Sequence, residues 1–166
     1  MKRNVKNSTN EISHCYYQYI DLYGVHIVLY YGSKDKCIKT TSRFLSKRNK
    51  TARKEIIDYL KKYIGSPEDT SDYFAADLRI DNIQWIFICI GTEYDLMDTR
   101  QIAYLSHECL HAAIFIAREH GFYEDEGNSE ALVYLQDFIL EKFLSKIRKT
   151  KNKVENNDNN KSNNSK

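Results

Sequence analysis

Three patterns that assign a chain to a class of protein are missing from this sequence. Its four cysteines, Cys15, Cys37, Cys89 and Cys109, form no CxxC pair, which argues against a cysteine-based zinc knuckle and a disulfide framework. No apolar run approaches the ~20 residues of a membrane-spanning helix. The polar N-terminus has no apolar stretch typical of a secretory signal. We therefore expect a cytoplasmic protein with no membrane partner, and cysteines that act as small buried hydrophobic residues.

The composition predicts one globular domain with two polar ends. The chain has 166 residues, of which 42% are hydrophobic and 29% are charged, enough for a single hydrophobic core. We expect the domain to cover residues 14–148. Residues 1–13 and the Lys- and Asn-rich stretch 149–166 contain too little apolar surface to offset the entropy of ordering the chain. We therefore predict that both ends are disordered.

The formal net charge of +2 hides a segregation of charge along the chain. Residues 34–62 contain 11 Lys or Arg and 3 acids, a net of +8, whereas residues 68–98 contain 8 acids and 1 Arg, a net of −7. The protein should have a basic side and an acidic side. The 34–62 segment could dock an acidic partner or, as a third hypothesis for the function, bind nucleic acid. The acidic remainder would repel phosphate and argues against nucleic acid.

Alternating apolar residues predict two β-hairpins. The stretches 16–23 and 25–31 are rich in Tyr, Val and Ile and meet near Gly24. The stretches 73–80 and 83–91 are separated only by an Asp-Asn pair. Together they predict a small antiparallel sheet.

Three segments have the spacing of apolar residues typical of helices. The first lies within residues 41–64 and stops at Gly65. The second runs from about residue 98 to 120 with Gly121 as its stop, and the third covers residues 129–147. The fold class is therefore α+β.

The second helix carries the sequence His107-Glu108-Cys-Leu-His111. Two histidines four residues apart lie on one helix face, so both rings can reach one ion. Glu108 lies about 100° around the helix and is placed to touch a metal-bound water. The helix is apolar nearly all round, which predicts burial, and buried polar groups need partners that a cation would supply. The alternative is a buried helix that acquired two histidines by chance.

A zinc ion with catalytic activity usually has three protein ligands, so a third is needed. His120 is nine residues beyond His111, on the opposite side of the helix and about 13 Å along it, which excludes it. Glu130, in the first turn of the next helix, is the better candidate because the acidic loop allows that helix to return antiparallel. The loop acids at 124–126 are alternatives, and His14 and His26 are weaker ones.

HECLHA followed by NSEALVYL resembles the gluzincin-type zincin metallopeptidases, and is similar to small HExxH proteins encoded by bacteriophages. The resemblance covers about residues 77–140. It implies a minimal zincin-like fold, with the sheet packed on the HExxH helix and a following Glu-bearing helix, in the host cytoplasm if the protein is phage-encoded. It also implies Zn²⁺ held by His107, His111 and Glu130, with Glu108 as general base. A peptide or protein substrate would bind in extended form beside a strand at 73–80 or 83–90.

The sequence departs from the family pattern at one position. Many gluzincins carry an aspartate four residues after the ligand glutamate, where it supports a ligand histidine, and this chain has Tyr134. Asp137 or Asp98 could substitute for it. Tyr123 and Tyr134 are candidates for stabilising the oxyanion. The departure favours an alternative function, in which a catalytically weak or inactive zincin-like fold binds a host factor.

Overall fold

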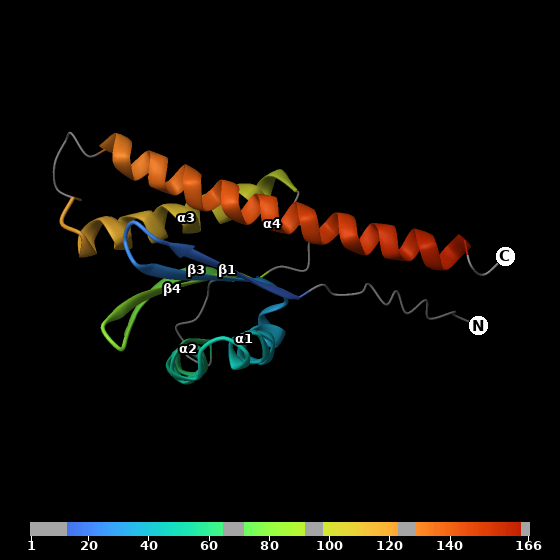
Figure 1. Ribbon diagram of the computed structural model, residues 1–166, viewed down its shortest axis with the longest axis horizontal. Helices are drawn as coiled ribbons and strands as arrows, with labels where there is room; N and C mark the ends of the chain where they lie inside the picture. Colours follow the sequence, from blue (N-terminus) through green and yellow to red (C-terminus); the bar gives the residue numbers. More distant parts are fainter. Residues whose placement is uncertain (1–12, 65–71, 92–97, 123–128, 164–166) are drawn as a thin grey trace, which may run out of the picture.

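The computed structural model describes residues 13–64, 72–91, 98–122 and 129–163, with side chains described up to residue 153. A four-stranded sheet lies between two pairs of helices (Figure 1). The elements are β1 (His14–Ile20), β2 (Val25–Gly32), a short 3-10 helix (Lys34–Lys36), α1 (Cys37–Ser46), α2 (Lys50–Ile64), β3 (Tyr73–Ile80), β4 (Ile83–Gly91), α3 (Thr99–Glu119) and α4 (Ser129–Asn163). The α+β prediction is confirmed.

Both predicted hairpins are present. β1 pairs with β2 and β3 pairs with β4, each antiparallel. The first hairpin turns at Gly24, whose φ is +64°. The second turns at Asp81 and Asn82, whose φ values are 52° and 60°. Two consecutive residues with positive φ are typical of a tight two-residue hairpin turn, in which Asp and Asn are favoured.

The sheet is mixed rather than antiparallel, which corrects the prediction. Its strand order is β1-β2-β4-β3, and β2 runs parallel to β4. Parallel neighbours require a long crossover connection, which α1, α2 and β3 provide. The result places β4 inside the sheet, where its residues after Ile83 are all buried, as in a strand covered on both faces. The edges of the sheet are β1 and β3.

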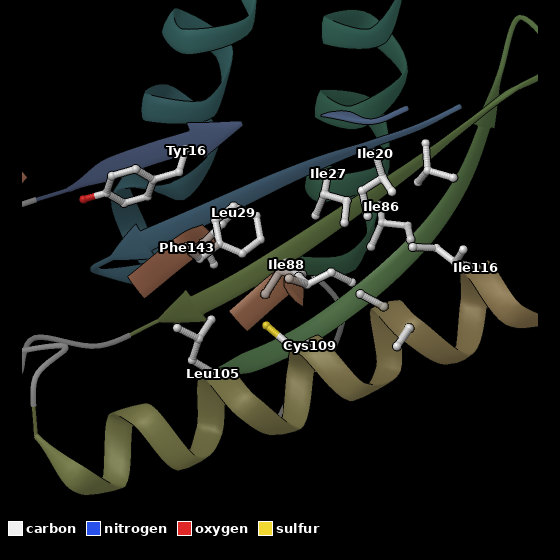
Figure 2. Close-up of a cluster of buried hydrophobic side chains, with 14 of the residues drawn as sticks. Tyr16, Ile20, Ile27, Leu29, Ile86, Ile88, Leu105, Cys109, Ile116 and Phe143 are labelled. Atoms are coloured by element: carbon white, nitrogen blue, oxygen red, sulfur yellow. The ribbon is translucent and has the colours of Figure 1, made fainter. Parts of the chain in front are cut away.

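Two hydrophobic clusters hold the layers together. On one face, side chains from the sheet meet α3 and α4, and Figure 2 shows Leu105, Cys109 and Ile116 of α3 pointing at Ile86 and Ile88 of β4. On the other face, the sheet packs on α1 and α2. Three of the four cysteines are buried, as predicted: Cys37, Cys89 and Cys109.

The helical segment predicted within residues 41–64 is two helices. α1 ends at Ser46 and α2 begins at Lys50. Asn49 begins α2 because its side-chain oxygen accepts a hydrogen bond from the Ala52 N–H at 2.9 Å. The sequence signal for this break is the asparagine between two basic runs.

α4 continues to Asn163, although a disordered tail was predicted from residue 149. Leu135, Ile139, Phe143 and Ile147 of α4 are buried against the core. This packing supplies the costly helix nucleus, and further turns then add at little cost even in a polar sequence. The predicted disorder at the N-terminus falls mainly on residues 1–12, outside the described residues. No described helix is long and apolar enough to span a membrane.

Candidate metal site

Helix α3 lies alongside edge strand β3. Near the start of both, the Tyr73 and Tyr104 rings stack with centroids 4.1 Å apart, and near the end Arg79 pairs with Glu119. The two segments have matching lengths, since six strand steps span about 20 Å and fifteen helix steps about 22 Å. The HExxH sequence lies between these contacts. Of the two strands predicted to lie beside the motif, β3 is the edge strand, whereas β4 is internal.

The two histidines of the motif face each other. His107 Nε2 and His111 Nε2 are 3.1 Å apart, and the rings are nearly perpendicular. Two imidazole nitrogens on one tetrahedral zinc, each about 2.05 Å from it, lie about 3.3 Å apart. Burial lowers the pKa of His111, and the nearby His107 lowers it further. The lowered pKa of His111 favours the neutral form that binds metal, and the two ring nitrogens lie at a spacing that fits a shared ion.

The exposure of these histidines corrects one part of the sequence argument. α3 was expected to be buried all round, but only one side of it is buried. His107 and His111 are exposed, on the side opposite the core residues Leu105, Cys109 and Ile116. Burial therefore does not oblige the two imidazoles to find a cation, and the geometric fit has to carry the metal hypothesis.

Glu108 is the buried polar residue of the motif. It is 5% exposed, and within the described residues its Oε2 has no hydrogen-bond partner. Burial raises its pKa, and the nearby His107 opposes the rise. Gln101, two turns earlier on the same side of α3, is 3% exposed and also leaves its side-chain oxygen unpaired. Such buried oxygens are costly unless a donor reaches them, and no donor from the described part of the chain reaches these two.

Glu130 is in the first turn of α4 and is exposed. The Gln136 amide of α4 donates to the backbone and side-chain oxygens of Ser106, at 3.1 Å each, which sets the antiparallel register of α3 and α4. Glu130 is six residues before Gln136 on α4, and Ala112 is six residues after Ser106 on α3. In this antiparallel register Glu130 lies level with Ala112, next to His111. Among the described residues, however, no three His, Cys, Asp or Glu side chains gather as a metal group. Glu130 as third ligand stays a prediction.

Of the supporting residues proposed from the sequence, Asp98 lies away from the histidines, whereas Tyr134 and Asp137 lie on α4. Tyr134 is 71% exposed, and Asp137 is also exposed. Asp98 instead begins α3, where its carboxylate accepts from the Arg100 N–H at 2.8 Å, about 13 Å from His107 along the helix. Tyr123 lies outside the described residues, as do the loop acids 124–126.

The structure adds site residues that sequence reasoning missed. Gln136 fixes α4 to α3 one residue before His107, and Gln101 shares the buried side of Glu108. The available signal was a polar residue within an apolar helix face. His14 and His26 lie in β1 and β2, and His120 ends α3 and packs on Tyr23.

Comparisons of the chain with protein-family models, with curated proteins and with solved structures found no match.

Proposed function

We propose that this protein is a zinc-dependent metallopeptidase that uses the HExxH sequence of α3. The observation that supports it best is the 3.1 Å separation of His107 Nε2 and His111 Nε2, which fits two ligands of one zinc ion. His107 and His111 would hold the ion, with Glu130 as the third ligand. A bound zinc ion would supply an activated water and a Lewis acid for the peptide carbonyl.

The chemistry of the chain's own residues is compatible with this reaction. Glu108 is partnerless at Oε2 within the described residues and its pKa is raised, so it is a stronger base than an exposed glutamate. In the proposed reaction Glu108 takes the proton of the attacking water and gives it to the leaving amine. β3 is an edge strand beside α3, which is the arrangement needed to bind a peptide in extended form.

Zinc content is the first test. Elemental analysis of the purified full chain should give about one zinc per molecule, and His111→Ala should lose it. Glu130→Ala should also lose zinc if Glu130 is the third ligand. Retention of zinc in Glu130→Ala would assign that ligand elsewhere, and no zinc in the wild type after reconstitution would overturn the proposal.

Activity is tested with the zinc-loaded chain and a mixed peptide library. Glu108→Gln should lower the cleavage rate by roughly 10²- to 10⁴-fold while zinc content and melting temperature stay near the wild type. Leu110→Met, a change on the same helix that leaves the polar residues intact, is the matched control. Equal cleavage by wild type and Glu108→Gln would show that a contaminant is responsible.

The second candidate function is a zincin-like fold that binds a host factor without cleaving it. Tyr134 favours this hypothesis because it stands where many gluzincins carry the aspartate that supports a ligand histidine. A binding protein would keep its partner affinity in Glu108→Gln, and the wild type would cleave no peptide even when loaded with zinc.

A further inference from the structure

A cluster of exposed bases occupies the end of the α1/α2 layer. We call it the basic ridge, and its residues are Arg43, Lys47, Arg48, Lys50, Arg53 and Lys54. No acid occurs between Asp35 and Glu55. Within the described residues Lys47, Lys50 and Lys54 form no ion pair. The ridge therefore presents concentrated positive charge that the described part of the fold does not neutralise.

Two of these bases are held in place. Arg48 lies over the Phe44 ring at 3.7 Å from its centroid and donates to the Phe44 carbonyl. Arg53 Nε donates to Ser42 Oγ at 3.0 Å, which ties α2 to α1. An arginine fixed on an aromatic face loses less freedom on binding than a lysine in solvent.

The ridge stands beside edge strand β1. Cys15 of β1 and Thr41 of α1 are in hydrogen-bond contact at 3.6 Å, and Phe44 packs in the same hydrophobic cluster as Tyr17. Arg48 lies over the Phe44 ring, so Phe44 connects the ridge with the side of β1 that carries Tyr17. Burial raises the pKa of Tyr17; Tyr19 and Asp21 add to the rise, and Arg48 opposes it.

Next to the ridge is an aromatic platform formed by Tyr17, Tyr19 and His26. Tyr17 and Tyr19 alternate along β1 and so share a face of the sheet. The Tyr17 hydroxyl is 2.6 Å from His26 Nδ1, and the Tyr19 and His26 rings are 4.7 Å apart. Trp85 lies beneath, stacked on His26 at 4.3 Å. Tyr19 is 40% exposed, so an aromatic face is accessible.

Positive charge also flanks β1 on the other face of the sheet. Lys146 of α4 donates to the Tyr17 carbonyl and to Gln18 Oε1. Lys142 is four residues before Lys146 and Lys149 is three residues after it, so the three lysines lie on one side of α4. Burial lowers the pKa of Lys146, and the charges of Lys142 and Lys149 lower it further. β1 thus lies between α4 on one face of the sheet and the α1/α2 layer on the other (Figure 1), and both layers carry bases.

We propose that the β1 edge binds single-stranded nucleic acid, with the phosphates on the basic ridge and the bases stacked on the aromatic platform. Single-strand binders combine a positively charged path with exposed aromatic faces, and both are present side by side. An acidic peptide added as a strand is disfavoured because Lys146 already occupies the Tyr17 carbonyl of this edge. The acidic segment 68–98 was an argument against nucleic-acid binding. Its residues Asp72, Asp77 and Asp81 lie at or beside the opposite edge strand, β3.

The test is fluorescence anisotropy of a labelled oligothymidine of about 20 nucleotides with the full chain, titrated at several salt concentrations. The affinity should fall linearly with salt on logarithmic axes. Tyr19→Ala should weaken binding by about fivefold or more through lost stacking. Arg48→Gln should weaken binding and reduce the salt dependence. The double variant Lys61→Gln, Lys62→Gln removes two positive charges at the far end of α2, away from the platform. It should therefore lower the affinity less than Tyr19→Ala or Arg48→Gln does.

Several results would overturn the proposal. The first is absence of binding at about 50 mM salt, and the second is a loss of affinity in the Lys61/Lys62 control as large as in Tyr19→Ala or Arg48→Gln. The third is tighter binding of a duplex of the same length. Equal affinity for polyglutamate of matched charge would assign the surface to an acidic protein. Melting temperatures of all variants must match the wild type, and Tyr19→Phe, which keeps the ring, should restore binding. None of these measurements depends on zinc or on peptide cleavage.

Discussion

The two edges of the sheet differ in charge and in what covers them. The β1 edge has bases of the α1/α2 layer on one side and Lys146 of α4 on the other, with Tyr17 and Tyr19 between. At the β3 edge, Asp72 precedes the strand, Asp77 is exposed within it and Asp81 follows it, and the HExxH helix lies alongside. One small sheet thus offers two chemically distinct surfaces, which allows two kinds of ligand to be kept apart.

This difference follows from the order of elements along the chain. The basic segment 34–62 forms the 3-10 helix, α1 and α2, which pack together on one face. The described part of the acidic segment 68–98 forms β3, β4 and the start of α3, and brings its exposed acids to the other edge. Elements adjacent in sequence are adjacent in space, so a charge imbalance along the chain becomes one across the molecule.

The largest expected effects test how each edge strand is attached. Gly32 of β2 and Gly91 of β4 are partners in the sheet. A Cβ on Gly32 would lie 2.6 Å from Oγ of Ser13, just before β1. A Cβ on Gly91 would lie 2.6 Å from the carbonyl oxygen of Asp72, just before β3. Gly32 also has a φ of +140°. We expect Gly32→Ala and Gly91→Ala each to cost about 2–3 kcal/mol of unfolding free energy, measured by urea denaturation.

Gly121→Ala is the control for these two variants. Its φ is +73°, but a Cβ there would meet nothing within 4 Å, so only backbone strain of about 1 kcal/mol is expected. If Gly91→Ala proved as stable as the wild type, the close contact with Asp72 would not anchor β3.

A smaller loss of unfolding free energy is expected when one cation is removed at each edge of the sheet. Lys146 is half-buried and donates to two oxygens of β1, so Lys146→Met should cost about 1–2 kcal/mol. Arg79 of β3 is exposed and pairs with Glu119, so Arg79→Met should cost less than about 1 kcal/mol. Thermal unfolding of both variants at low and high salt measures the difference, and equal costs would contradict it.

The next prediction rests on the proposed peptidase activity. The acids of the β3 edge should favour substrates with basic residues. Asp77→Asn keeps the acceptor for the Gln84 amide, at 3.0 Å, but removes the charge. We expect kcat/KM for a lysine-containing peptide to fall about two- to fivefold, the range of an exposed charge pair, with no fall for its glutamate counterpart. Equal changes for both peptides would mean that Asp77 does not face substrate.

Local patterns predicted most of the fold. Gly24 and the Asp81-Asn82 pair marked both hairpins, and Asp98 and Gly121 marked the ends of α3. The strand order was not predictable from these patterns, because the parallel pairing of β2 and β4 depends on how α1 and α2 pack across the sheet. Helical periodicity also could not give the extent of α4, since its polar end follows from packing of the part before it.

The site was predicted only in part. Spacing alone brings His107 and His111 together, because residues four apart on a helix meet whatever the tertiary structure. The burial of Glu108 and the exposure of both histidines depend on which side of α3 packs on the sheet. The apolar residues around nearly the whole helix did not indicate which side packs on the sheet, and Ala103, one of them, is exposed. Long-range partners such as Gln136 had no local signal beyond their polarity.

The smallest expected effect is a pH dependence at the β1 edge. Burial lowers the pKa of His26 below its usual 6.5, so between that lowered value and 6.5 the unfolded chain binds more protons than the folded one. The His26 contribution to stability is therefore complete above 6.5 and is lost as the pH falls through 6.5 towards the folded pKa. The melting temperature of the wild type should fall more between pH 7.5 and 5 than that of His26→Phe, which keeps a ring over Trp85. His120→Phe, an exposed position outside the sheet, should follow the wild type, and an identical pH response of His26→Phe would mean that other groups set the acid sensitivity of this edge.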